Sequence, residues 1–252
     1  NQTVRYLKQE MQLDGYREVC QISDEFNRMI GEINTLTHQL VRTTSNLYES
    51  ELQKKQSELL HLRSQINPHF LYNTLESIMG MAYLEEAPQT AQMVGNLGKI
   101  FKYSVKGQDM VPVREELATT RAYIGIQLMR FEGVFQAEEQ VDPAILEYRI
   151  PKMILQPLVE NAITHGIGNK RGGGTVTIAT REEPDNWLIT VQDDGCGTDN
   201  IAADGLPPQQ EGGFIGLANV RQRVESIARG RLHFSSIKNK GATVTVVLPK
   251  ER

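Results

Sequence analysis

Residues 175–197 read TVTIATREEPDNWLITVQDDGCG and contain two short runs in which apolar and polar side chains alternate. The alternating apolar residues are Val176 and Ile178 in the first run, and Trp187, Ile189 and Val191 in the second. A period of two residues is typical of a β-strand with one buried face. We therefore predict strands over 175–180 and 187–193, the second ending at Asp193.

Helical patterns surround this pair of strands. Residues 115–131, 154–167 and 217–228 are amphipathic at helical spacing, and a last alternating run, 244–248, ends before Pro249. The glycines at 172–174 predict a turn before the first strand. Strands mixed with helices that pack to one side predict an α+β sandwich.

The first half of the chain has a different character. Few glycines or prolines interrupt residues 1–106, and Gly107 and Pro112 mark a boundary after them. Its apolar residues follow the heptad spacing of a coiled coil: Ile22, Phe26, Met29, Ile33, Leu36 and Leu40, then Thr43 and Leu47, and after a slip of register Leu52, Leu59, Leu62 and Ile66. One helix with such a stripe would be poorly soluble, so we predict a dimer; a purely structural rod is the alternative.

Pro68 interrupts this helical pattern. A proline removes a helical N–H and crowds the preceding turn, so we predict a kink there. The apolar seam restarts after it, and at 100° per residue His69, Asn73 and Glu76 share the face opposite Leu71. Without the kink, His69 would instead extend the earlier seam as a structural residue.

Composition excludes several classes of protein. The chain has 252 residues, of which 39% are hydrophobic and 23% charged, with a net charge of −4. This fits one or two folded domains and gives no electrostatic reason to expect nucleic-acid binding. Cys20 and Cys196 are too few for a disulfide framework or a cysteine zinc site, which favours a reducing, cytoplasmic environment. No apolar run approaches the roughly 20 residues that span a bilayer. Because the chain begins with Asn1, we expect a piece of a longer protein.

Asn161 and His165 form the first candidate site in the second half. They lie at positions i and i+4 of a predicted helix and therefore share a face. An amide oxygen suits Mg²⁺, and an imidazole can reach a phosphate oxygen. The alternative is a polar helix face capped by Gly166.

Asp193 and the glycines after it form the second candidate. Asp193 keeps the parity of the buried residues of its strand, and a buried carboxylate needs a hydrogen-bond donor. An adenine amino group would supply one, and Gly195 and Gly197 would let the backbone approach the base. The alternative is a tight turn that Asp193 caps.

The third candidate is the glycine-rich run 212–217. Glycines before a helix expose N–H groups that bind phosphate. The run lacks the Walker A and GxGxxG patterns. The alternative is a flexible lid hinge.

The order of these motifs resembles one family. Residues 65–75, QINPHFLYNTL, resemble the phosphoacceptor box of YesM/LytS-type sensor histidine kinases, and residues 155–162, LQPLVENA, resemble their N box. Residues 193–197 and 213–223 resemble the two glycine boxes, and residues 1–40 resemble the end of a HAMP signalling module. The resemblance covers nearly the whole chain, and its first two motifs are long and specific.

The resemblance implies an ATP-dependent autokinase. His69 would be phosphorylated on a homodimeric helical bundle and would pass the phosphoryl group to an aspartate of a response regulator. The implied domains are a HAMP-like end and signalling helix (1–47), a dimerisation and phosphotransfer region (48–110) and a Bergerat-type ATP-binding domain (111–252). The chain would be the cytoplasmic portion of a cell-membrane protein, anchored only through an upstream transmembrane region.

The resemblance also implies roles for single residues. Asn161 would hold Mg²⁺ with Glu160 assisting, and Asp193 would bind adenine. Further residues that would line the nucleotide site are His165, Gly195, Gly197, Gly213, Gly216 and Leu217, with Thr243 bordering the adenine pocket. Phe214 stands where the second glycine box usually has the first glycine of Gly-x-Gly, so Gly213 would substitute for it.

Chemistry on the phosphoacceptor helix needs two more groups. A neutral imidazole is a competent nucleophile near pH 7. Phe70, not an acid, follows His69, so Glu76, seven residues on, is our candidate proton acceptor. The amide of Asn73 could orient a water molecule toward a phosphorylated regulator.

Two other functions fit part of this pattern. One is an ATPase of the same fold, as in gyrase or mismatch-repair proteins, which would lack the His69 box. The other is a non-catalytic dimeric scaffold, which would not need Asn161 and Asp193.

Overall fold

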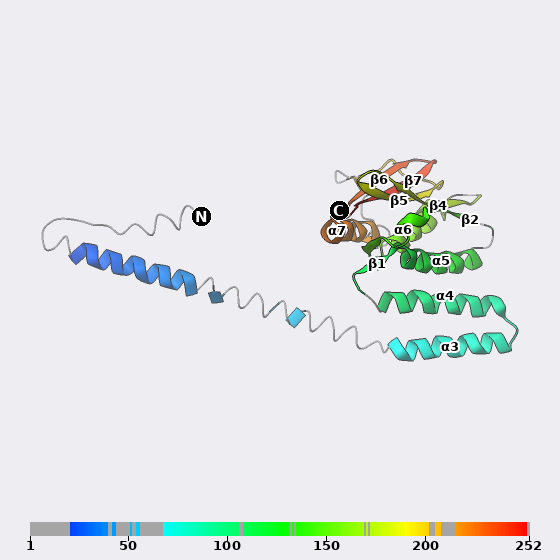
Figure 1. Cartoon of the computed structure of the whole chain (residues 1–252), viewed down its shortest axis with the longest axis horizontal. Helices are drawn as coiled ribbons and strands as arrows, with labels where there is room; N and C mark the ends of the chain where they lie inside the picture. Colours follow the sequence, from blue (N-terminus) through cyan, green and yellow to red (C-terminus); the bar gives the residue numbers. More distant parts are fainter. Residues whose placement is uncertain are drawn as a thin grey trace. The chain divides into compact units, whose positions relative to one another are not determined.

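The computed structural model describes residues 21–39, 42–43, 51, 54–55, 68–105, 108–131, 133, 135–168, 170, 172–201, 205–207 and 215–250. The chain divides into two compact units, Asn1–Asn67 and Pro68–Arg252. Figure 1 colours the chain from the blue helix of the first unit to the red strand near the C-terminus. None of the helices within the described ranges is long and apolar enough to cross a membrane.

The first unit contains a helix over residues 21–39, which confirms the helical prediction there. Its seam residues face solvent in the single chain, with exposed fractions from 41% to 68%: Ile22, Phe26, Met29, Ile33 and Leu36. The later seam positions Leu40, Leu47, Leu52, Leu59, Leu62 and Ile66 lie outside the described residues. The exposed stripe is the surface that a second helix would cover, and the dimer stays a prediction.

The second unit begins with a helical hairpin, α3 (Pro68–Leu84) and α4 (Pro88–Val105). Both helices begin at a proline, whose missing N–H has no intrahelical partner at the first position. The ring of Tyr72 on α3 meets the ring of Phe101 on α4 edge to face, 5.4 Å apart. Residues 56–67, just before Pro68, lie outside the described residues, so the kink stays a prediction.

A five-stranded sheet follows, in the order β2-β4-β5-β7-β6. Its strands are β2 (Phe135–Gln140), β4 (Gly174–Glu182), β5 (Asn186–Asp193), β6 (Arg231–Ile237) and β7 (Gly241–Pro249). β2 runs parallel to β4, and the other pairs are antiparallel. The short strands β1 (Met110–Pro112) and β3 (Arg149–Pro151) pair separately, and a 3₁₀ turn η1 (Pro143–Ile145) precedes β3.

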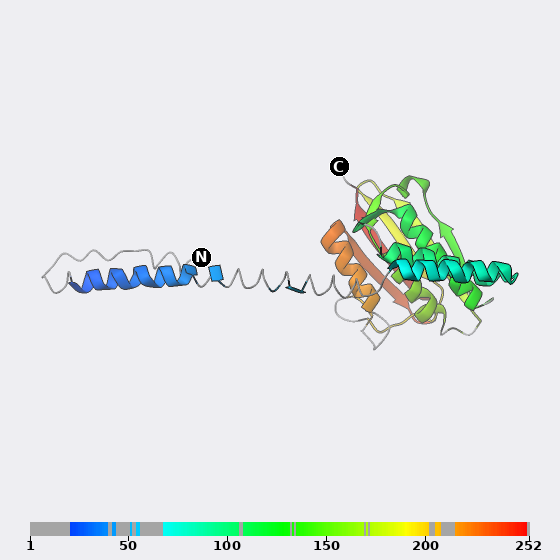
Figure 2. The same ribbon diagram turned by 90° about the horizontal axis from the view of Figure 1, so that it is seen from below.

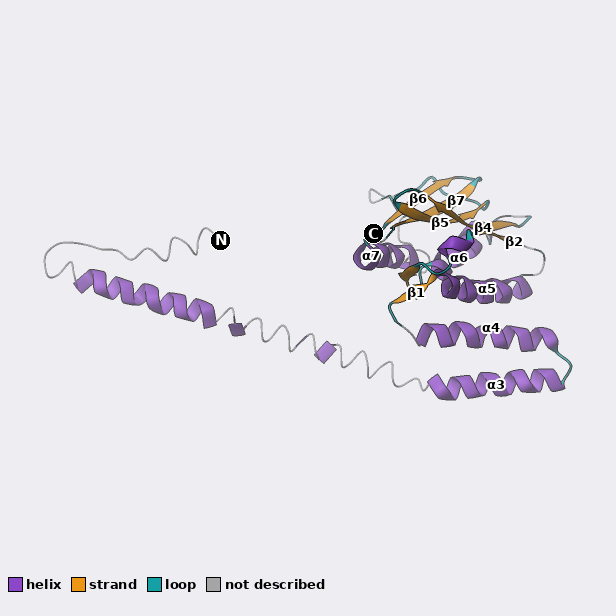
Figure 3. Ribbon diagram, in the orientation of Figure 1, coloured by secondary structure: helices purple, strands orange, loops and turns teal. Residues whose placement is uncertain are grey.

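Helices cover one face of this sheet (Figure 3). They are α5 (Val113–Arg130), α6 (Leu155–Asn161) with the π-helical turn η2 (Ala162–Ile167), and α7 (Ile215–Ala228). The hairpin packs on this helical layer through contacts of α4 with α5, and Figure 2 shows it from below. The α+β architecture expected from the sequence is confirmed.

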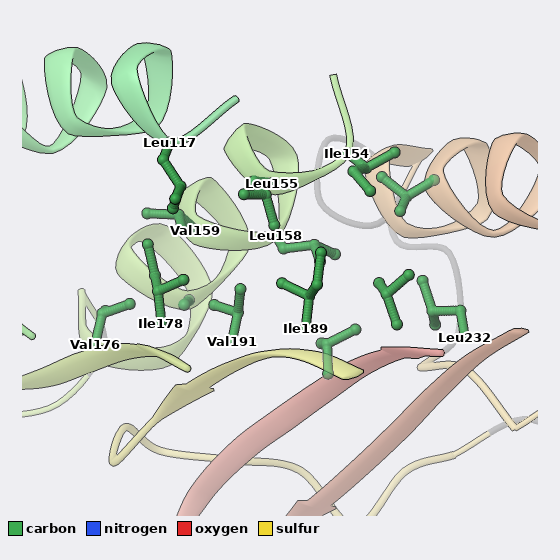
Figure 4. Close-up of a cluster of buried hydrophobic side chains, with 14 of the residues drawn as sticks. Leu117, Ile154, Leu155, Leu158, Val159, Val176, Ile178, Ile189, Val191 and Leu232 are labelled. Atoms are coloured by element: carbon green, nitrogen blue, oxygen red, sulfur yellow. The ribbon is translucent and has the colours of Figure 1, made fainter. Parts of the chain in front are cut away.

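The core lies between the helices and the sheet (Figure 4). Its buried side chains come from both layers: Leu117, Ile154, Leu155, Leu158 and Val159 from the helical side, and Val176, Ile178, Ile189, Val191 and Leu232 from the strands. Alternate residues of β4 and β5 point to the other face, as the period of two predicts.

Two strands of the five-stranded sheet were not predicted from the sequence. In β2 only Phe135 is buried and the remaining residues are exposed, so a polar edge strand gives no alternating signal. β6 is the opposite edge and buries only Leu232 fully. The predicted helix 154–167 also differs, because its second half is the π-helical turn η2. One-turn π segments often occur at functional sites.

Candidate active site

A pocket opens between η2, α7 and the strands β5, β6 and β7. It holds about 510 Å³ of empty space including its open mouth. Its lining residues are Leu158, Asn161, Ala162, His165, Gly166, Val191, Asp193, Gly197, Thr198, Leu217, Phe234, Ser236, Ala242 and Val244. Most of these side chains are apolar, so the few polar groups fix what the pocket can recognise.

Asp193, at the end of β5, is the buried charge of this pocket, with 5% of its surface exposed. Its Oδ1 accepts a hydrogen bond from the N–H of Gly195 at 2.9 Å. Burial raises the pKa of the carboxyl above its ordinary value, although the N–H groups of Gly195 and Ala242 oppose the shift. Asp193 therefore points to the buried face of its strand, as the alternation in the sequence predicted. Its carboxylate can accept a hydrogen bond from a ligand amino group.

Glycines let the backbone close around Asp193. A Cβ on Gly166 would lie 2.4 Å from Asp193 Oδ1, and one on Gly195 would lie 2.2 Å from the carbonyl carbon of Gly166. Gly241, at φ +98°, would place a Cβ 1.9 Å from the carbonyl oxygen of Asp193. The N–H of Cys196 donates to the Gly166 carbonyl at 2.9 Å. Only glycine fits these positions, so the glycine box packs directly on η2.

Asn161 and His165 both line the pocket, as their spacing predicted. The Asn161 Nδ2 is buried and has no hydrogen-bond partner within the described part of the chain. An orphaned amide donor fits a phosphate oxygen, and an amide oxygen is a ligand that suits Mg²⁺. No cluster of three or more His, Cys, Asp or Glu occurs among the described residues.

Glu160 lies on another side of the same helix. It lines a separate hollow with Tyr123, Gln127 and Arg130 of α5, and it is exposed. Burial, and then the nearby Glu160 carboxylate, raise the pKa of Tyr123 to about 12. The structure therefore does not bring Glu160 into the pocket of Asp193, because adjacent helical residues point about 100° apart.

The remaining predicted nucleotide residues have different outcomes. Leu217 lines the pocket, and a Cβ on Gly216 would lie 3.5 Å from Asn161 Nδ2, so both adjoin the site. Gly213 lies outside the described residues. The expectation for Thr243 is corrected: Ala242 and Val244 line the pocket, and the residue between them on β7 points to the opposite face of the sheet.

Sequence reasoning missed the side chains that β6 and the loop after β5 contribute. Phe234 and Ser236 alternate on β6 and line the pocket, as does Thr198. The Ser236 Oγ accepts from the Thr198 N–H at 2.7 Å. A weak alternation of Leu232, Phe234 and Ser236 was the only available signal.

On α3, His69, Asn73 and Glu76 are all exposed, as predicted. Asn73 Nδ2 lies 3.4 Å from His69 Nδ1. Glu76 lines a groove between α3 and α4 beside Lys99 and Lys102. Seven helical residues separate Glu76 from His69 by about 10 Å along the axis, which is beyond hydrogen-bond reach. Glu76 of the same chain is therefore not placed to take the proton of His69 directly.

Two family models match the chain. One is described as histidine kinase and matches residues 57–135; the other is described as histidine kinase-, DNA gyrase B- and HSP90-like ATPase and matches residues 148–252. The first range contains the exposed His69, and the second contains the pocket residues Asn161 and Asp193.

Two relatives are similar to this chain over most of its length. "Sensor histidine kinase YesM" of Bacillus subtilis is 34% identical over 237 residues, covering 92% of this chain and 39% of the relative. "Sensor protein LytS" of Bacillus subtilis is 30% identical over 227 residues, covering 84% and 38%. This chain thus spans less than half the length of these relatives. The histidine kinase domain of a blue-light activated histidine kinase from Erythrobacter litoralis is similar with a TM-score of 0.45 and 16% identity, over 72% of this chain and 95% of that one.

Proposed function

This chain belongs to the histidine kinase family, and from that premise we propose that it autophosphorylates His69 with ATP and then passes the phosphoryl group to an aspartate of a response regulator. The observation that carries the proposal is the combination of an exposed His69 on α3 with a pocket that is lined by the buried Asp193. An ATPase of the same fold would need the pocket but not the histidine.

In the proposed complex, different pocket residues contact the adenine base and the phosphates of ATP. Asp193 accepts from the adenine amino group, and apolar side chains such as Val191 and Val244 pack against the base. Asn161 lies toward the phosphates, where its orphaned amide supports contact with a phosphate oxygen and with Mg²⁺. Mg²⁺, when bound with ATP, neutralises phosphate charge during transfer.

The transfer itself needs positioning more than covalent machinery. A ring nitrogen of His69 attacks the γ-phosphorus, and the bond from that phosphorus to the β–γ bridging oxygen breaks. ADP leaves, and the imidazole releases its proton to water. The exposed position of His69 supports access both by the nucleotide and by a regulator.

We propose further that the active form is a homodimer in which 1–47 is a HAMP-like end and signalling helix, 48–110 the dimerisation and phosphotransfer region, and 111–252 the ATP-binding domain. The exposed seam on the helix over 21–39 supports pairing of two chains. The full-length protein would be anchored in the cell membrane through an upstream region, with this portion in the cytoplasm.

Incubation with γ-labelled ATP tests the proposal. We expect acid-labile, base-stable label on the protein, no label in His69→Gln, and loss of Mg²⁺-dependent labelling in Asn161→Ala. His233→Gln is the matched control, since His233 is an exposed histidine on β6. If the label is recovered only as free phosphate, the protein is an ATPase without phosphotransfer. If ATP is not turned over at all, the protein is a non-catalytic scaffold.

Asn73 gives a second test on the same helix. Its amide lies beside His69, a position from which it could orient water toward a phosphorylated regulator. We expect Asn73→Ala to keep autophosphorylation nearly intact but to slow loss of phosphate from the regulator. Unchanged dephosphorylation in a folded variant would contradict this role, and a joint fall of both rates with the melting temperature would indicate a structural role instead.

A further inference from the structure

A buried carboxylate joins the phosphoacceptor hairpin to the helix that carries Asn161. Glu116 of α5 is 1% exposed. Its Oε1 accepts from the N–H of Met153 at 2.5 Å, and its Oε2 accepts from the N–H groups of Ile154 and Leu155 at 2.9 Å each. Leu155 is the first residue of α6, Ile154 is its cap position and Met153 comes just before it. Ile154 supplies no side-chain cap of its own. Glu116 therefore caps α6 from a helix that lies far away in the sequence.

Tyr103, near the end of α4, donates its hydroxyl proton to Oε1 of the same carboxylate. Burial and the Glu116 charge raise the pKa of Tyr103, so the phenol stays a donor. Lys152 lies over the Tyr103 ring at 4.8 Å and donates to the Ser104 carbonyl at 3.3 Å. The end of α4 is thus tied to the segment that starts α6.

This tie lies at the end of the hairpin where His69 is found. Tyr72 of α3 packs on Phe101 of α4, and the two helices run antiparallel. His69, three residues before Tyr72, is therefore level with the last turn of α4, where Tyr103 lies.

The other end of the tie leads to the nucleotide pocket. α6 runs from Leu155, whose N–H bonds to Glu116, to Asn161, which lines the pocket. Seven helical residues extend about 10 Å. The Glu116 carboxylate consequently holds one end of a short rigid element whose other end carries the candidate phosphate contact.

We propose that Tyr103 and Glu116 are positioning residues: the Tyr103–Glu116 hydrogen bond sets how the His69 end of the hairpin is held relative to the pocket. The inference rests on the proposed kinase function. Tyr103 would act on the transfer step alone, because α6 keeps its cap without it. Glu116 would act on both nucleotide binding and transfer.

The test uses the full 252-residue chain. Tyr103→Phe removes only the hydroxyl and keeps the ring under Lys152. We expect its Kd for Mg-ATP, measured by calorimetry, to stay within twofold of the wild type. We expect its rate of His69 labelling at saturating ATP to fall about tenfold, the factor that corresponds to about 1.4 kcal/mol.

Tyr148→Phe is the matched control. Tyr148 is half-buried, and its hydroxyl donates to the Pro249 carbonyl at the far end of β7. It removes a tyrosine hydroxyl bond of the same kind but leaves Glu116 untouched, so its labelling rate and Kd should both match the wild type. Glu116→Gln should weaken Mg-ATP binding and slow His69 labelling together. The double variant with Tyr103→Phe should be labelled only slightly more slowly than Glu116→Gln alone.

The outcomes separate the inference from the proposed function. If the wild type itself gives no label on His69, the proposed function is wrong. If the wild type is labelled and Tyr103→Phe keeps or exceeds its rate, the positioning role is wrong. If the affinity for Mg-ATP and the labelling rate fall together in Tyr103→Phe, the hydroxyl contributes only to folding and the inference also fails. This decision does not depend on whether Glu116→Gln folds.

Discussion

At Asp193, burial and recognition act on one side chain. Asp193 is 5% exposed, and its carboxylate can still accept a hydrogen bond from a ligand. We expect Asp193→Asn to weaken ATP binding by about 10- to 150-fold, the effect of one charge-assisted hydrogen bond. The same change should weaken GTP binding much less, because guanine presents a carbonyl oxygen where adenine presents its amino group. Calorimetry with both nucleotides measures the difference.

The neighbouring Asp194→Asn is the control for this experiment. Asp194 is exposed and accepts from the Thr175 N–H at 2.8 Å, outside the pocket lining. Its replacement should leave the ratio of ATP to GTP affinity unchanged. An equal loss of affinity for ATP and GTP in Asp193→Asn would contradict adenine recognition by this carboxylate.

The same residue predicts a pH dependence of stability. Burial raises the folded-state pKa of Asp193 above its ordinary value of 3.8. A group with a raised pKa contributes its stability fully below the unfolded-state value, and loses it as the pH rises through the folded-state value. The melting temperature of the wild type minus that of Asp193→Asn should therefore decrease from pH 3.5 to pH 7. Melting curves without nucleotide test this, and a difference that grows with pH would contradict the assigned shift.

At the scale of elements, the helix over 21–39 shows an apolar seam without a covering surface in its own chain. Met29→Asp with Leu36→Asp places two charges in the seam of each helix, and burying them in a dimer would be costly. We expect sedimentation to show a dimer for the wild type and at least a tenfold weaker association for the double variant. His38→Asp, which lies opposite the seam in the heptad, should leave association unchanged.

The turn η2 shows how an element can depend on its neighbours. Asn161 and His165 share the pocket even though the helix widens into a π turn between them. Gly166 within the turn gives the space that Asp193 occupies. The backbone conformation of η2 therefore depends on its packing against β5 as much as on the helical propensity of its own residues.

At the scale of the whole molecule, the pocket residues that the structure describes all lie between Leu158 and Val244. We expect a fragment of residues 108–252, which keeps the β1–β3 pair, to bind Mg-ATP with a Kd within threefold of the full chain. It should take up no label, because His69 is absent. Calorimetry and labelling test both parts, and a fragment that folds but fails to bind would show that the hairpin completes the pocket.

The sequence by itself determined the features that follow from local periodicity. The strands β4, β5 and β7, the inward position of Asp193, the helix over 21–39 and the shared face of His69 and Asn73 all repeat at the period of their element. Only the tertiary structure decided which faces meet: it turned Thr243 away from the pocket, separated Glu160 from Asn161, and added the polar edge strands β2 and β6. Glu116 is the clearest case, because the backbone N–H groups that it accepts from lie 37 to 39 residues away. Within its own helix it is one more acid in the first turn. Its role exists only because folding brings an uncapped helix end to this buried side chain.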